Sequence, residues 1–428
     1  MATTLESTLK RIRDHRLPDL DLGPKAVHPA YDGLSILNVP SSLCRWLGAP
    51  ELPHPAINHA EFDDLASGAR QVVVILVDAV GLNLFERWLE GRAQSLQPLV
   101  SSGLLGALTS VVPSTTSAAL TTLWTGRSPA EHGILGYELF LREYGLVANM
   151  ITHAPASFED EAESLAHAGF DPNTFLPVPT IGPHLSEAGI EPHAFLHVRI
   201  AGSGLSRMHF PKVHQHSFAD LPDLWVQLRQ LMETASDARR LIWGYFGDVD
   251  YLAHRHGPGD KRVEAEFARF ADSMMDDFIN PLSASARRDS VLIVMADHGQ
   301  VTTRKDPHFE LRNHPDLLRR LHMSPSGENR LAYLYPRPGQ MEAVEEYIAR
   351  AWPRMFRTMA SGHALEAGLF GPGRPAKAAR SRIGDRLALS QGEGYLWWAA
   401  KDNPLIGRHG SITADEMLVP FLMVRLDA

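Results

Sequence analysis

Buried strands that end on acidic residues are the feature that most restricts how this chain can fold. The segments "QVVVILVDAVG" (71–81), "RRLIWGYFGDVD" (239–250) and "SVLIVMADHG" (290–299) are mostly apolar runs that end with Asp. A run without polar alternation is typical of a parallel strand covered on both faces. Helix-like segments follow the strands, as in "LNLFERWLE" (82–90). The pattern predicts an α/β fold, a mostly parallel central sheet flanked by helices, with polar residues at the carboxyl ends of the strands.

Two segments interrupt this alternation. Residues 155–235 contain one strand-like piece, "HAFLHVRI", and residues 312–400 are rich in Gly and Pro towards their end. We therefore expect a single catalytic α/β domain, 1–428, with its core at about 25–154, 236–311 and 401–428. The segment 155–235 is expected to be an inserted cap and 312–400 a second, flanking insert. Five histidines of the first insert, expected on the surface or in a pocket, are His193, His197, His209, His214 and His216.

The composition narrows the class of protein. The 428 residues include 41 Lys and Arg against 50 Asp and Glu, a formal charge of −9. This balance argues against a nucleic-acid polymer or an anionic membrane as partner. The one cysteine, Cys44, excludes a disulfide framework and a thiolate metal site. A charged N-terminus and the lack of a long apolar run favour a cytoplasmic protein. The oligomeric state stays open.

Residues with metal-ligand chemistry follow the predicted strands. Asp250 and His254 are four residues apart in "DVDYLAHRHGP", so a helix would place both on one face. Each motif alone has an ordinary explanation, such as a helix cap or a surface pair. Together they offer three carboxylates and three imidazoles, which suits two zinc ions, with manganese or iron as substitutes. The six candidate ligands are Asp78, Asp250, His254, Asp297, His298 and His409.

A pair of hydroxyls supplies a candidate nucleophile. In "VVPSTTSAALTTLWTGRSPAEHGI" (111–134), Thr115 and Thr116 lie between an apolar strand and a helix rich in small residues. Helix capping is the structural explanation for either threonine. A hydroxyl beside zinc ionises far more easily than a free one, as zinc-bound water does. A threonine placed near the predicted ions could therefore attack phosphorus.

At these residues the chain resembles the alkaline phosphatase superfamily, and within it the type I phosphodiesterase/nucleotide pyrophosphatase family. The matching pieces are "VVVILVDAVG", "PSTTSAALTTLWTGRSPAEHGI", "DVDYLAHRHGP", "LIVMADHG" and "GRHGS", in the family's order across 72–411. The family's nucleophile lies ten residues before the glycine of the Thr-Gly element, which is Gly126 here. The resemblance thus implies Thr116 as nucleophile, with Thr115 as the second choice.

The resemblance also divides the ligands between two zinc ions. It implies one ion held by Asp78, Thr116, Asp297 and His298. It implies a second ion held by Asp250, His254 and His409.

Two departures from related patterns matter. In this family an asparagine three residues after the nucleophile helps to bind a phosphoryl oxygen, and here that residue is Ala119. Asn83, Asn149, the backbone N–H groups at the helix start and the zinc ions are candidate replacements. Sulfatases share the "TGRxPxxHG" element but need Pro and Arg where this chain has Ala118 and Leu120, so a sulfatase is excluded.

The resemblance implies a two-zinc hydrolase that cleaves phosphodiester or phosphoanhydride bonds through a phosphothreonine intermediate. Its substrate would be a small phosphate ester, with a nucleotide as one candidate. A phosphomonoesterase or phosphonate hydrolase using the same site is the first alternative. A non-catalytic binding protein with structural zinc is the alternative from another class.

Overall fold

The central sheet of the computed structural model has seven strands. The model describes residues 3–157 and 161–427. All strands of this sheet run in one direction except β16, which is antiparallel to β2 and β9. This confirms the predicted α/β fold with a mostly parallel sheet. In spatial order the strands are β2 (Leu104–Thr109), β16 (Leu418–Arg425), β9 (Ser290–Met295), β1 (Gln71–Val77), β8 (Arg239–Phe246), β6 (Ile190–His197) and β7 (His214–Phe218).

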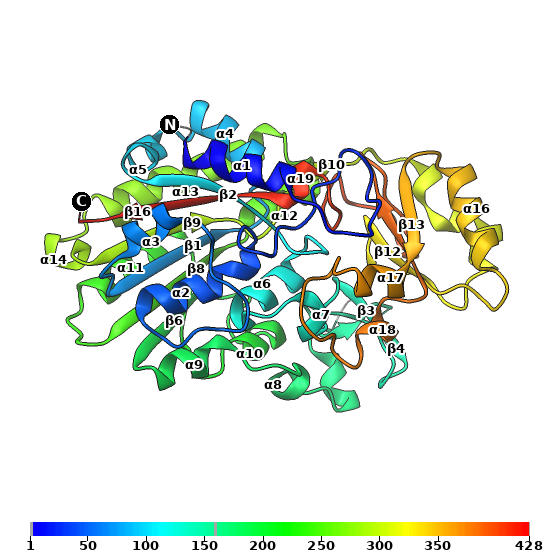
Figure 1. Ribbon diagram of the computed structural model, residues 1–428, viewed down its shortest axis with the longest axis horizontal. Coiled ribbons are helices and arrows are strands. Elements are labelled where there is room, and N and C mark those ends of the chain that lie inside the picture. Colours follow the sequence, from blue (N-terminus) through cyan, green and yellow to red (C-terminus); the bar gives the residue numbers. More distant parts are fainter. Residues whose placement is uncertain (1–2, 158–160, 428) are drawn as a thin grey trace.

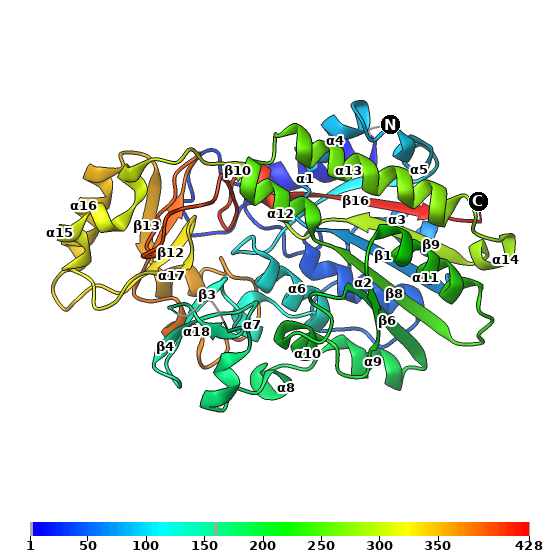
Figure 2. The same cartoon turned by 180° about the vertical axis from the view of Figure 1, so that it is seen from behind.

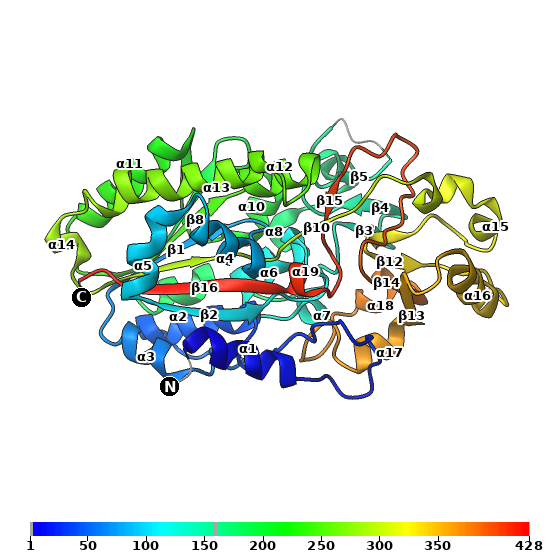
Figure 3. The ribbon, with the colours of Figure 1, turned by 90° about the horizontal axis from the view of Figure 1, so that it is seen from above.

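Helices cover both faces of this sheet, and that explains why its inner strands are apolar throughout. Every residue of β1 after Gln71 is buried. Figure 3 shows the sheet between two helical layers. One layer contains α11 (Leu221–Glu233) and α13 (Lys261–Ser273), and the other contains α2 (Val39–Leu47) and α3 (Ala60–Ala66). Strands β8 and β9 both pair with β1 in parallel register, so the loops after these three strands meet at one edge.

A second seven-stranded sheet lies at the other end of the molecule (Figure 1). The predicted insert 312–400 supplies four of its strands, and the segment 138–155 supplies the other three. The second sheet therefore combines the flanking segment with residues that the sequence pattern assigned to the core. Its order is β13 (Phe356–Ala360), β14 (Arg386–Ser390), β12 (Leu331–Leu334), β11 (Ser326–Glu328), β3 (Glu138–Leu141), β4 (Leu146–Asn149) and β5 (Ala154–Pro155).

The first predicted insert contributes to the central sheet. Strands β6 and β7 come from this segment and extend the sheet beyond β8. Helix α10 (Gly204–His209), from the same segment, packs against α6 (Thr116–Thr125). The segment thus forms an edge of the core as well as a cover, whereas the sequence pattern suggested a cap. Residues 158–160 of the predicted insert lie outside the described residues.

Among the described residues, no helix has the length and apolar character needed to cross a bilayer.

Candidate active site

The predicted acidic ligands lie at the carboxyl ends of three neighbouring strands. Asp78 directly follows β1, and Asp297 and His298 come after β9. Asp250 lies in the first turn of α12 (Asp248–His256), which begins two residues after β8 ends. Asp297 and His298 are fully buried, and Asp78 is 2% exposed. Parallel strands bring these side chains together because their carboxyl ends meet at one sheet edge.

The other two predicted histidine ligands, His254 and His409, complete the cluster. His254 lies one turn after Asp250 on α12, and its Nε2 is 3.4 Å from Asp250 Oδ2. His409 lies on the loop between β15 (Gly407–Arg408) and α19 (Ala414–Met417). The Nε2 atoms of His409 and His254 are 3.3 Å apart, and the rings of His409 and His298 stack with centroids 4.0 Å apart. All six predicted ligands therefore lie in one cluster.

Thr116 is the first residue of α6, and its hydroxyl points into the cluster. Its Oγ1 lies 3.3 Å from Asp78 Oδ2 and 3.1 Å from His298 Nε2. Thr115 occupies the N-cap position in an extended conformation, but its side chain does not cap the helix. Instead, Thr115 hydrogen-bonds to Glu328. Of the two candidate nucleophiles, Thr116 is thus the one hydrogen-bonded to predicted metal ligands.

The imidazole rings are oriented as metal ligands require. In each ring Nδ1 bonds to a backbone carbonyl, which leaves Nε2 facing the cluster. A ring whose Nδ1–H donates to a carbonyl carries its free lone pair on Nε2, as in most histidine–metal sites. The pairs are His254 with Gly407 (2.9 Å), His409 with Ser114 (3.0 Å) and His298 with Gly299 (3.1 Å).

Unsatisfied carboxylate atoms show that the cluster fits a cation. Asp78 Oδ1 and Asp297 Oδ2 are buried and have no hydrogen-bond donor. Such an atom is costly unless a positive group faces it. Ligand atoms of Asp78, Asp297 and His298 lie within 4.8 Å of one another, and so do those of Asp250, His298 and His409. His298 thus lies between the two groups.

Electrostatics indicate the same need for positive charge. Burial, followed by the charges of Asp297 and Asp250, raises the pKa of Asp78 well above its usual value. Burial also raises the pKa of Asp297 to about 7. Burial and the neighbouring histidines lower the pKa of His409. These acids repel one another in a dry site, so a divalent cation would restore their ionised forms.

Two further side chains, which sequence reasoning missed, hold the acids in place. The Tyr245 hydroxyl donates to Asp78 Oδ2, and the Gln300 amide donates to Asp250 Oδ1. Tyr245 pairs with Leu76 in the β1–β8 register, near the carboxyl end of both strands. In the sequence, Tyr245 could have been noticed as a tyrosine close to the carboxyl end of an apolar strand.

Replacing Tyr245 by Phe should lower metal affinity or kcat by about 10- to 100-fold, the usual effect of removing a group that orients a metal ligand. The change leaves the ring in place and removes one donor from Asp78. Metal affinity by competition with a chelator, and kcat at saturating metal, measure the effect. Tyr144→Phe, a half-buried tyrosine on the turn between β3 and β4 and outside the cavity, is the matched control. Equal losses in both variants would contradict the assignment.

A cavity of about 700 Å³ opens above Thr116, between helix α12 and strands β3 and β11 of the second sheet. Its aromatic and apolar walls include Trp397 and Trp398 from the predicted second insert and Leu405 from the segment after it. Glu328 adds a carboxyl to the wall. This composition suits a substrate with an organic group beside its phosphate.

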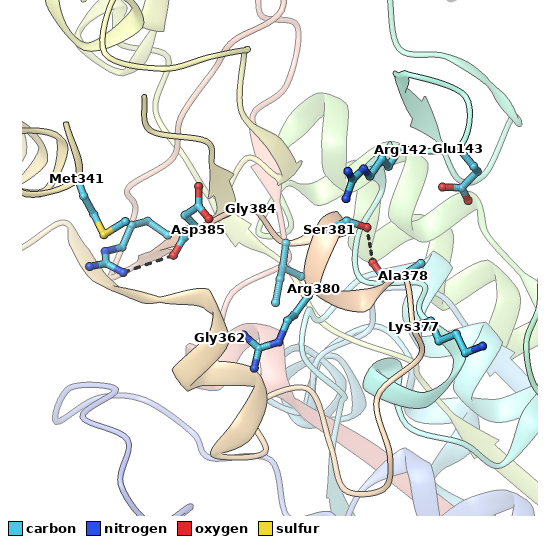
Figure 4. A pocket seen from close by; sticks show the side chains of 12 residues that line it. Arg142, Glu143, Met341, Gly362, Lys377, Ala378, Arg380, Ser381, Gly384 and Asp385 are labelled. Atoms are coloured by element: carbon cyan, nitrogen blue, oxygen red, sulfur yellow. Dashed lines mark hydrogen bonds between the residues drawn. The ribbon is translucent and has the colours of Figure 1, made fainter. Parts of the chain in front are cut away.

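A larger hollow of about 1000 Å³ lies elsewhere, against the second sheet. Figure 4 shows Arg380, Lys377 and Asp385 around it. None of the predicted catalytic or metal-binding residues lines this hollow. Arg380 is paired with Glu366. The cavity above Thr116 is therefore the candidate substrate site.

The two asparagines suggested as replacements for the family's phosphate-binding asparagine, Asn83 and Asn149, lie outside the substrate cavity. Asn83 donates to Asp415 (2.6 Å), and Asn149 accepts two backbone N–H groups of the following turn. Neither lines the cavity above Thr116. Ala119 is fully buried. The backbone N–H groups of the first turn of α6, which lack a side-chain cap, remain as donors beside Thr116.

Comparison with known proteins identifies the family of the chain. The model of the type I phosphodiesterase/nucleotide pyrophosphatase family matches residues 72–412. No curated protein matches the chain at a significant level. Among solved structures, murine ectonucleotide pyrophosphatase/phosphodiesterase 5 is 18% identical, with a TM-score of 0.62, over 82% of this chain and 87% of that chain.

A bacterial enzyme has a similar fold. Phosphonoacetate hydrolase from Sinorhizobium meliloti, solved with phosphonoacetate, is 17% identical, with a TM-score of 0.59, over 83% of this chain and 90% of that chain. The family match spans most of the chain and includes every predicted ligand. The chain therefore belongs to the type I phosphodiesterase/nucleotide pyrophosphatase family of the alkaline phosphatase superfamily, and it is a metal-dependent hydrolase of phosphoester bonds.

Proposed function

We propose that this protein hydrolyses phosphodiester or phosphoanhydride bonds by attack of the Thr116 hydroxyl on phosphorus. The observation that carries the proposal is the position of Thr116 Oγ1, 3.3 Å from Asp78 Oδ2 and 3.1 Å from His298 Nε2, beneath the substrate cavity. A hydroxyl serving only as a helix cap would face the first backbone N–H groups of its own helix. This one faces an acid and an imidazole instead.

We propose two zinc ions as the resident metals. Asp78, Asp297 and His298, together with Thr116, would hold one ion. Asp250, His254 and His409 would hold the other. When bound, zinc lowers the pKa of the threonine hydroxyl and neutralises charge on the phosphoryl group. Oxygen and nitrogen donors in this ratio suit zinc and tolerate manganese or iron.

The chain's own residues support a two-step reaction. In the first step Thr116 Oγ1 forms a bond to phosphorus, and the bond from phosphorus to the leaving oxygen breaks. In the second step a water oxygen bonds to phosphorus and the phosphothreonine bond breaks, which regenerates the hydroxyl. Backbone N–H groups in the first turn of α6 are placed to donate to a non-bridging oxygen. They would take over the role of the asparagine that Ala119 replaces.

A nucleotide-like substrate is our preferred class. Murine ectonucleotide pyrophosphatase/phosphodiesterase 5 was solved with AMP as an inactive threonine-to-alanine variant. That inactive variant supports a catalytic threonine and a nucleotide ligand in the relative. In this chain, Trp397, Trp398 and Tyr137 line the cavity and offer flat apolar surfaces to a base.

We expect a higher kcat/KM for bis(p-nitrophenyl) phosphate than for p-nitrophenyl phosphate at one pH and zinc concentration. A monoester dianion needs a cationic clamp beyond the metals, whereas a diester carries one charge and a second organic arm. Three cations line the cavity, and each has a partner: Arg255 donates to Tyr251 (2.6 Å), Arg408 donates to Asn403, and Lys401 also has an interaction within the protein. Of the insert arginines, Arg207 pairs with Glu163 (2.9 Å) and Arg199 lines a different hollow.

The comparison of these two substrates also tests the alternatives. A clear preference for the monoester would contradict the diesterase proposal and favour a phosphomonoesterase. No zinc-dependent hydrolysis of either ester, nor of a phosphonate, would favour a non-catalytic binding protein.

Glu328 should make substrate binding dependent on pH. It is 7% exposed, and its Oε1 accepts the backbone N–H of Tyr137 (2.6 Å). Burial raises its pKa to about 8, and the charges of Glu138 and Glu416 add to this rise. Because the pKa is raised, the carboxyl is neutral below about pH 8 and becomes an anion above it. An anionic wall repels a phosphate ester, so KM should rise between pH 7 and pH 9.

Glu328→Gln should remove this rise, because an amide cannot ionise. The variant and the wild-type protein are compared by KM for the diester across that pH range, at saturating metal. Protonation of the metal ligands changes with pH in the same way in both proteins, so it does not contribute to the difference between their KM profiles. Parallel KM profiles would show that Glu328 does not set substrate binding.

A further inference from the structure

Three histidines gather at the far edge of the central sheet, outside the catalytic cluster. Strands β6 and β7 pair in parallel, with His193 opposite His214 and Phe195 opposite His216. Side chains two residues apart on a strand share a face, so His214 and His216 project beside His193. In Figure 2, β6 lies beyond β8 at the side of the sheet away from β16. None of the three histidines lines the cavity above Thr116.

The three rings contact one another. The His193 ring stacks with those of His214 and His216, at centroid distances of 4.9 Å and 5.3 Å. His193 Nδ1 and His216 Nε2 are 3.0 Å apart. Zn–N bonds of about 2.0–2.1 Å place two nitrogens of a tetrahedral site about 3.3 Å apart. The His193–His216 pair thus already has nearly the spacing of two ligands on one ion.

The remaining nitrogen of His193 faces a carboxylate. His193 Nε2 is buried without a hydrogen-bond acceptor, and Glu191 Oε2 lies 3.8 Å away. Arg240 holds that carboxylate through a contact of 3.1 Å. A carboxylate behind the second nitrogen is the usual support of a metal-binding imidazole, because it fixes the tautomer and raises ligand basicity. The other nitrogen, Nδ1, is the atom that faces His216, and a bound ion would replace the one proton shared across that 3.0 Å hydrogen bond.

Charge and exposure at this edge also suit a metal. Burial and the neighbouring His216 and His214 lower the pKa of His193 to about 4, so this ring is neutral and keeps its lone pair at neutral pH. Burial also lowers the pKa of His216. His214 is exposed on the edge strand, and its ring can turn without disturbing the core.

We propose that His193, His214 and His216 form a separate binding site for a divalent transition ion such as Zn²⁺, with Glu191 as the carboxylate behind His193. Two ligands on one strand, two residues apart, and a third on the neighbouring strand form a three-histidine site with an open fourth position. The exposed His214 ring turns its nitrogen toward the other two when the ion binds. The ion joins β7, an edge strand of mostly polar residues, to β6.

The number of bound zinc ions tests the site. Full-length wild-type protein, stripped with a chelator and dialysed against micromolar zinc, is compared with the double variant His214→Gln/His216→Gln by elemental analysis. The wild-type protein should hold one more ion per chain, and zinc should raise its melting temperature more. Gln215→Ala, on the opposite face of the same strand, is the matched control and should bind as the wild-type protein does.

The comparison is independent of the proposed catalytic function. The double variant should bind one zinc ion fewer than the wild-type protein, whether or not the catalytic cluster holds metal. Diester hydrolysis should be unchanged in the double variant and in Gln215→Ala. His193→Gln, checked for folding by its melting temperature without zinc, should also lose the ion. Equal zinc content in the wild-type protein and the double variant overturns the proposal, and so does loss of the ion in Gln215→Ala.

Discussion

Thr116→Ala should reduce turnover of a phosphodiester by about 10⁴-fold or more, while the protein keeps its fold and most of its metal. The substitution removes the atom that would bond to phosphorus, so no covalent step is possible. The metal-binding carboxylates and imidazoles stay in place. The rate of p-nitrophenolate release, together with the melting temperature and metal content, measures the outcome.

Thr115→Ala is the matched control for this prediction. Its side chain does not cap α6 and bonds to Glu328 instead, so the loss is one hydrogen bond worth about 1 kcal/mol. Activity should fall by no more than about tenfold. If Thr115→Ala abolished turnover and Thr116→Ala did not, the nucleophile would be Thr115.

Removal of metal should abolish activity, and zinc should restore it. This second large effect follows from the cluster itself, because among the described residues Asp78 Oδ1 and Asp297 Oδ2 are buried without a hydrogen-bond partner. Chelation leaves buried acids facing one another, which is unfavourable for both the substrate and the fold. Elemental analysis of the zinc-supplemented protein, with activity measured before and after chelation, checks the prediction.

The variant Asp78→Asn distinguishes between two roles of the acidic cluster, a metal-binding role and a purely structural one. In the chelated protein, the raised pKa of Asp78 already favours the neutral carboxyl, so the neutral amide should leave the melting temperature nearly unchanged. With zinc present, the same variant should melt lower than the wild-type protein and hydrolyse the diester far more slowly. His409→Ala should also lower activity, through the other group of ligands. A variant that melts lower than the wild-type protein under both conditions would indicate a purely structural aspartate.

The ligands at strand ends could be predicted because their positions follow from topology. Asp78, Asp250 and Asp297 each come at or just after the end of an apolar run, and parallel strands place such ends together. His409 precedes an antiparallel strand in a short loop, so the sequence named it as a candidate ligand, and the family resemblance assigned it to the second ion. The family resemblance also identified Thr116, rather than Thr115, as the expected nucleophile.

Other features could not be read from the pattern. Strand β7, "HQHSF", is polar because it lies at an edge, so it carries no apolar signal, and its segment was assigned to a cap. The short strand β3 pairs with β11, almost 200 positions away, and local periodicity does not contain that information. Tyr245, Gln300 and Glu328 act through side-chain contacts that depend on strand register and loop packing.

The central claim is that Thr116 forms a covalent bond to phosphorus, and trapping the intermediate tests it most directly. Zinc-loaded protein is mixed with bis(p-nitrophenyl) phosphate, quenched with acid within the first turnover and digested for mass spectrometry. The account predicts a p-nitrophenyl phosphate adduct on Thr116, formed together with a burst of p-nitrophenolate and absent from Thr116→Ala. The claim would be contradicted if zinc-dependent turnover occurred with no adduct on Thr116 at any quench time and if the turnover rate were undiminished in Thr116→Ala.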